Sequence, residues 1–106
     1  MPTVREIFEK MPASFQEEAA AGLSAVILFD VTGDGGGRFC VVLEDGALRI
    51  TESDHEAPTL TLTVSAQDYI DITEGKLNPQ LAFMTGRFKA AGDLRLAMNM
   101  PKIFKQ

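Results

Sequence analysis

Two short segments of alternating apolar and polar residues flank an Asp45-Gly46 dipeptide, and this pattern constrains the fold more than any other feature. Alternation with a period of two is typical of a half-buried strand, and Asp-Gly is a strong signal for a tight hairpin turn. Residues 38–44 and 47–50 are therefore expected to pair. The apolar run 25–29 predicts a further strand, buried on both faces, and the glycine-rich residues 32–37 predict the turn that joins it. Residues 25–50 should thus form an antiparallel meander.

Two more segments extend the predicted sheet. Leu60, Leu62 and Val64 alternate with threonines over residues 59–65, which is the clearest strand pattern in the chain. The polar residues 53–58 are expected to form the loop before it, and residues 87–91 a fifth, short strand.

Helices are predicted where a capping residue precedes an apolar pattern of helical period. Five are expected, capped in turn by Thr3, Ser14, Ser65, Asn78 and Asp93. The first four should end at Pro12, Gly22, Gly75 and Gly86, and Pro101 should kink or break the last. Because strands and helices are largely segregated along the chain, we expect an α+β fold: a five-stranded, mostly antiparallel sheet with helices on one face.

Length and composition favour an ordinary globular protein. The 106 residues suit one domain, residues 1–106, with 45% hydrophobic and 24% charged residues. No apolar run approaches the length of a transmembrane helix. Arg5, Glu6, Glu9 and Lys10 lie where a signal peptide would be apolar, and Cys40 has no cysteine to pair with, so a cytoplasmic location is expected.

The charge is unevenly distributed along the chain. The net charge of −5 argues against nucleic acid as the main partner. Residues 1–75 carry 14 acidic and 4 basic groups, whereas residues 76–106 carry 1 acidic and 6 basic groups. The two segments can neutralise each other in the folded protein, or the basic segment can meet an anionic headgroup or make a transient contact with a membrane surface.

No group of residues has the pattern of a catalytic or metal site. His55, the single histidine, has no second histidine or nearby cysteine, and Cys40 is expected to be a small buried apolar residue. The glycines of residues 33–37 lack the lysine and the following helix of a phosphate-binding loop. We therefore expect no enzyme activity, no cofactor and no metal.

The last predicted helix carries more apolar surface than one packed face requires. Leu94, Ala97 and Met98 form one stripe, and Leu96, Met100 and Ile103 form a second. Such a helix either packs between two layers of an ordinary tight core or borders something apolar that is not protein.

Several short motifs resemble those of the sterol carrier protein domain family, in the family's order over about residues 3–104. They are Phe-Asp-Val-Thr-Gly-Asp-Gly-Gly-Gly at 29–37, Asp-Gly at 45–46, Gly-Lys-Leu-Asn-Pro at 75–79, Ala-Phe-Met-Thr-Gly-Arg-Phe-Lys at 82–89 and Gly-Asp-Leu at 92–94. The chain ends Phe-Lys-Gln, so the Ser-Lys-Leu-like signal of peroxisomal members is not expected. Because 106 residues leave no room for a second domain, the chain is expected to be a free-standing, bacterial-type member.

The resemblance implies an apolar tunnel between the sheet and the helices, closed in part by the C-terminal helix. It implies non-covalent binding of a lipid such as a fatty acid, fatty acyl-CoA, sterol or phospholipid. The tunnel wall is expected to comprise Leu60, Leu62, Ile70, Phe83, Met84, Phe88, Leu94, Met98, Met100, Ile103 and Phe104. A headgroup would be steered by Lys76, Arg87, Lys89 and Lys102. The alternative is an interaction or dimerisation module that uses the apolar C-terminal helix; the oligomeric state is left open.

Overall fold

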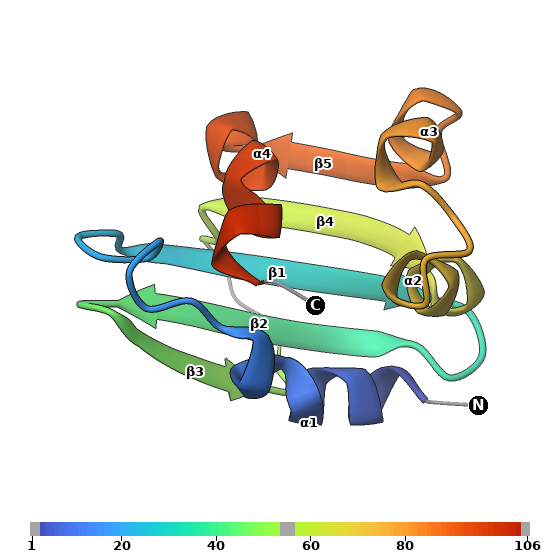
Figure 1. Cartoon of the computed structure of the whole chain (residues 1–106). Helices are drawn as coiled ribbons and strands as arrows, with labels where there is room; N and C mark the ends of the chain where they lie inside the picture. The colour runs from blue at the N-terminus through green and yellow to red at the C-terminus, as the bar shows by residue number, and fades with distance from the viewer. Residues whose placement is uncertain (1–2, 54–56, 105–106) are drawn as a thin grey trace.

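The computed structural model describes residues 3–53 and 57–104 and has a five-stranded sheet at its centre (Figure 1). The strands lie in the order β3-β2-β1-β4-β5. Their bounds are β1 Ala25–Thr32, β2 Gly37–Glu44, β3 Ala47–Thr51, β4 Leu60–Ser65 and β5 Phe88–Gly92. The pairing of β1 with β4 is parallel and the other three pairings are antiparallel. The predicted meander is β1-β2-β3, and the fold class expected from the sequence is confirmed.

Helices α1, α2 and α4 lie against one face of this sheet, and α3 stands at the start of β5 (Figure 1). The bounds of the four helices are α1 Val4–Ser14, α2 Ala66–Thr73, α3 Pro79–Met84 and α4 Leu94–Ile103. Thr3, Ser65, Asn78 and Asp93 cap them through side-chain oxygens that accept from backbone N–H groups of the first turn, as predicted. None of the described helices has the length and apolar content that a membrane span requires.

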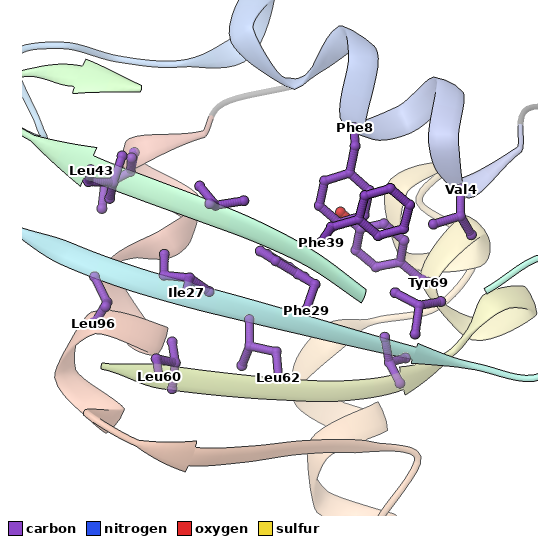
Figure 2. Close-up of a cluster of buried hydrophobic side chains, with 14 of the residues drawn as sticks. Val4, Phe8, Ile27, Phe29, Phe39, Leu43, Leu60, Leu62, Tyr69 and Leu96 are labelled. Carbon is purple, nitrogen blue, oxygen red and sulfur yellow. The ribbon is translucent and has the colours of Figure 1, made fainter. Parts of the chain in front are cut away.

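The core forms where the helices cover alternate residues of the strands. Val41, Ile27 and Leu60 pair in one row across β2, β1 and β4 and are fully buried. Phe8 extends from α1 into an aromatic cluster with Phe29, Phe39 and Tyr69, as Figure 2 shows. Burial of this continuous apolar layer is the main force that holds the helices on the sheet.

The opposite face of the sheet is also buried at its centre. Leu28 and Cys40 pair across β1 and β2, point away from the helices, and are nearly inaccessible. The expectation that the first strand is buried on both faces is thus correct, as is the prediction of a buried cysteine.

The second predicted helix, over residues 14–22, is wrong. Pro12 does not stop α1, which continues to Ser14, and Ser14 donates its hydroxyl to the Met11 carbonyl instead of capping a new helix. Residues 17–22 form turns. Pro12 is tolerated because it lies in the last turn of α1, where it costs little more than one backbone hydrogen bond.

Of the two outcomes predicted at Pro101, a kink or a break, the break does not occur. Helix α4 runs through position 101 to Ile103. Leu96 and Ile103, on either side of that position, are both buried against the rest of the protein. Packing on both sides therefore keeps the helix continuous, although proline weakens it locally.

Candidate functional site

The large apolar side chains that are exposed to solvent are concentrated on two helices. Among the described residues they are Leu81, Phe83 and Met84 of α3 and Leu94 and Met98 of α4, each between 51% and 79% exposed. We call these five residues the C-terminal apolar surface. The two helices flank β5, with α3 before it and α4 after it (Figure 1). Large apolar side chains gathered on neighbouring elements and left exposed are a candidate place for a ligand or partner to bind.

Strand β5 connects this surface to the core. Its residues Phe88 and Ala90 are partly buried, face the helices, and pair with Val64 and Leu62 of β4. Leu62 is itself buried in the core. An apolar molecule held between α3 and α4 would therefore rest on β5 and lie close to the inner residues of β4.

Helix α4 is attached to the rest of the protein at its two ends. At its start, Asp93 donates its N–H to the Thr59 carbonyl at 3.0 Å, and its Oδ1 caps the helix. At its end, the Ile103 carbonyl accepts from the Gln16 N–H at 2.7 Å, and the rings of Phe104 and Phe15 lie 5.7 Å apart. These contacts at the two ends add to the burial of Leu96 and Ile103, which holds the helix on the sheet.

The two apolar stripes predicted on this helix have different surroundings. Leu96 and Ile103 of one stripe are buried, whereas Leu94 and Met98 of the other face solvent. The helix therefore has an inner apolar face that belongs to the core and an outer one with no protein over it among the described residues.

The structure places the predicted wall residues at three depths. Four are in the buried core: Leu60, Leu62, Ile70 and Ile103. Three are partly buried and pack against it: Phe88, Met100 and Phe104. Four are exposed on α3 and α4: Phe83, Met84, Leu94 and Met98. Leu81 joins the exposed set without having been expected, and its signal was its i−3 spacing from Met84 on the same helix.

The four predicted headgroup residues are not equivalent. The guanidinium of Arg87 donates to both carboxylate oxygens of Asp68, at 2.6 and 3.3 Å, and holds the pKa of that carboxyl below its usual value. Lys76 lies 3.7 Å from a carboxylate oxygen of Glu74. Lys89 and Lys102 are exposed and have no ion pair within the described part of the chain. Arg87 is thus the cation least available to a ligand.

Two open hollows lie elsewhere on the surface. One, of about 440 Å³, is lined by Arg5, Phe8, Glu9, Pro12, Phe39, Leu48, Ile50 and Glu52, between α1 and the strands β2 and β3. The other, of about 330 Å³, lies between residues 19–23 and α4. Of the predicted wall residues only Ile103 lines either of them. The first hollow, beside α1, was not predicted from the sequence. Its apolar lining residues Leu48 and Ile50 follow the ordinary alternation of a strand, which gives no sign of a binding site.

The described residues form no candidate metal site. No cluster of three or more histidine, cysteine or acidic side chains among them could hold a metal. Burial raises the pKa of the Cys40 thiol, which keeps it protonated and unreactive. His55 lies outside the described residues.

Comparison with known proteins assigns the family. The model of the SCP-2 sterol transfer family matches residues 5–105. The chain belongs to this family. The resemblance seen in its motifs is thereby confirmed, and membership supports binding or transfer of a lipid as the class of function.

The chain is similar to proteins of quite different length. It is 29% identical over 105 residues to hydroxysteroid dehydrogenase-like protein 2 of Pongo abelii. The aligned residues make up 97% of this chain and 25% of that protein, so this chain spans about a quarter of the length of that relative. The sec-alkylsulfatase Pisa1 from Pseudomonas sp. matches with a TM-score of 0.83 at 18% identity, covering 99% of this chain and 17% of that one. Palmitated SCP2L2 from Aedes aegypti matches with a TM-score of 0.80 at 20% identity, covering 99% and 96%.

Proposed function

We propose that the protein binds one apolar lipid non-covalently between its sheet and the helices α3 and α4, and releases it unchanged. The observation that carries the proposal is the concentration of exposed large apolar side chains on these two helices. Membership in a sterol transfer family supports it, and one structural neighbour is a palmitated protein. The ligand class comprises fatty acids, fatty acyl-CoA, sterols and phospholipids.

Entry of the lipid requires α4 to move away from the sheet. In the present arrangement Leu96 and Ile103 pack into the core, so the inner side of the helix is occupied by protein. Displacement of α4 would open an apolar space bounded by Leu62 and Ala90 on the sheet and by Leu96 and Ile103 on the inner face of the helix. Its backbone hydrogen bonds to Thr59 and Gln16 lie at its two ends, so the helix can shift as a unit.

The hydrophobic effect supplies enough free energy for such binding. Each buried methylene contributes about 0.8 kcal/mol, so ten methylenes contribute about 8 kcal/mol, which corresponds to a Kd on the order of 1 µM before the costs of association. Lys102, exposed on α4, is the headgroup cation best placed to meet a carboxylate or phosphate. No covalent step is required.

Adjacent alanines of β5 offer a matched test. Ala90 faces the helices and Ala91 faces the opposite side of the sheet, where it pairs with Thr61. We expect Ala90→Phe to fill the proposed space and weaken binding of a fluorescent fatty acid at least about tenfold, since a displaced chain segment of two methylenes already exceeds 1.4 kcal/mol. Ala91→Phe should leave the affinity unchanged.

Both variants must first give the far-UV circular dichroism spectrum of the unchanged protein. Equal affinity of the Ala90 and Ala91 variants would show that the ligand does not lie on this face of β5. Native mass spectrometry of lipid that co-purifies with the unchanged protein then identifies the ligand.

A further inference from the structure

Strand β3 forms one edge of the sheet, and its outer side has no described partner. It pairs with β2, and no described strand or bridge lies on its other side (Figure 1). Its five residues include one charged side chain, Arg49, and no proline. Proteins usually protect an exposed edge with charges, prolines or bulges, because its free backbone N–H and C=O groups can pair with another chain. The edge of β3 has little of this protection.

The register of the hairpin shows which backbone groups of β3 are free. Residues 45–46 form a two-residue turn, so Glu44 and Ala47 at its ends form a hydrogen-bonded pair. Hydrogen-bonded and non-hydrogen-bonded pairs alternate along an antiparallel ladder. The backbone N–H and C=O groups of Leu48 and Ile50 therefore point away from β2, toward the open edge, where an added strand would meet them.

The hollow beside α1 lies along the same edge. Leu48 and Ile50 pair with residues of β2 that are buried under the helices, so their side chains face the helices as well. Both line the hollow of about 440 Å³, with Phe8 and Pro12 on the side of α1. A strand added beside β3 would place every second side chain next to this hollow, about 7 Å apart. An unpaired strand, a helix and an apolar hollow between them together suit an extended peptide.

The other edge strand, β5, differs from β3 in both respects. It carries Lys89, and a lysine on an edge strand opposes pairing with another chain. None of its residues lines either of the two hollows. The free backbone groups and the apolar hollow therefore occur together at β3.

The charges around the hollow favour a basic partner. Three charged residues line it: Arg5, Glu9 and Glu52. The Arg5 guanidinium donates to both carboxylate oxygens of Glu52, at 2.6 and 2.8 Å. Glu9 is exposed and has no ion pair within the described residues. A lysine or arginine of the partner would thus meet an uncompensated carboxylate, in a segment of 75 residues that carries 14 acidic and 4 basic groups.

We propose that an extended segment of another protein pairs with the outer edge of β3 as a sixth strand of the sheet. Two of its apolar side chains, two positions apart, enter the hollow beside Leu48 and Ile50, and a neighbouring lysine or arginine meets Glu9. Main-chain hydrogen bonds supply affinity, while the hollow and Glu9 select the sequence. β3 and β5 are opposite edges of the sheet, so this interaction does not depend on the proposed lipid site.

Selection of peptides on the full chain tests the proposal. A phage-displayed library of random peptides of about twelve residues is selected on the immobilised protein, a length that covers β3 with flanking residues on both sides. The enriched peptide is then synthesised with a fluorophore for binding by fluorescence polarisation. We expect its sequence to hold apolar residues at two alternate positions, next to a lysine or arginine. Failure to enrich any peptide of this pattern would refute the proposal.

Matched variants locate the peptide on the protein. Leu48→Ser should weaken binding about tenfold or more, whereas Leu23→Ser, the same change at another half-buried residue packed on the core, should leave it within about twofold. Glu9→Lys should weaken binding about tenfold, and Glu18→Lys, an equal change of net charge at an exposed residue outside the hollow, much less. Equal losses within either pair would overturn the assignment to this hollow.

N-methylated peptides test the backbone pairing itself. Methylation of the alternate amides that face β3 should abolish binding, and methylation of the intervening amides should not, because those N–H groups point away from β3. Equal tolerance of both sets would rule out strand addition. This test needs no change to the protein, so it holds even where Leu48→Ser does not fold.

Two further measurements separate the other possible occupants. A dimer that light scattering detects and that Leu48→Ser dissociates would assign the edge to a second copy of the chain. Displacement of the bound peptide by a fluorescent fatty acid would assign the hollow to a lipid. Either result would overturn the proposal, whereas a monomer that binds peptide and fatty acid independently would support it.

Discussion

Replacement of Phe8 is expected to be among the most damaging changes in the chain. Its ring lies 4.2 Å from that of Phe39 in a nearly parallel stack, 5.1 Å from Phe29 edge-on, and 5.4 Å from Tyr69. The side chain is 3% exposed. Truncation to alanine leaves a cavity beneath α1, and such Phe→Ala changes cost about 3–5 kcal/mol of unfolding free energy.

Phe8→Leu separates aromatic contacts from simple burial. Leucine keeps most of the apolar area but loses three ring pairs, each contributing roughly 0.5–1.5 kcal/mol, so we expect a cost of about 2 kcal/mol after partial repacking. For a domain near this size, that lowers Tm by about 8–16 °C. Phe15→Leu serves as the control, because Phe15 has one ring contact, with Phe104, and should cost much less.

Urea unfolding followed by two signals measures these costs. Far-UV circular dichroism reports the whole fold, and tyrosine fluorescence reports the aromatic cluster, since the chain has one tyrosine and no tryptophan. If Phe8→Leu unfolds within about 0.5 kcal/mol of the unchanged protein, the ring geometry contributes nothing beyond burial and the reasoning fails.

Three other changes test separate parts of the structure. Arg87 depresses the pKa of Asp68, so the stability this pair provides is present above roughly pH 4 and lost as pH falls through the lower folded-state pKa; Asp68→Asn should flatten the acid limb of a plot of unfolding free energy against pH. Cys40, buried with a raised pKa, should react with a thiol reagent only as fast as the protein opens, and rapid labelling at pH 8 in native buffer would contradict its burial. Gly92 has φ +110°, and a Cβ there would collide with the Thr59 carbonyl, so Gly92→Ala should cost about 1–3 kcal/mol in urea unfolding, whereas unaltered stability would mean that the β5–α4 junction can relax.

The sheet could be predicted because its signals are local. Asp45 and Gly46 both have positive φ, as a tight hairpin turn of this kind requires, and the alternation on either side sets which residues face the core. The helix caps were equally readable, since a cap is a contact between residues two or three positions apart. The helix predicted after Ser14 was wrong because a serine hydroxyl can either accept from a following N–H, as a cap does, or donate to a preceding carbonyl. In the structure it donates to the Met11 carbonyl.

The candidate site could be predicted only in part. Spacing showed that α4 has two apolar stripes, but which one faces the core depends on contacts with distant residues such as Gln16 and Thr59. The same holds for Arg87, between α3 and β5, whose carboxylate partner Asp68 is 19 positions away on α2. Whether an apolar side chain of α3 or α4 faces the core or the solvent thus depends on tertiary contacts, and no local sequence pattern can predict it.

The one parallel pairing of the sheet has a consequence for the order in which the protein assembles. β1 and β4 meet through pairs such as Ile27 and Leu60, 33 positions apart, whereas β1, β2 and β3 join through short turns. Distant segments close slowly because loop entropy is lost before their contacts form. We therefore expect a nascent chain to complete its N-terminal hairpins while α3 and α4 are still unattached. The two helices that carry the exposed large apolar side chains would then be the last to pack, and would be open to aggregation until they do.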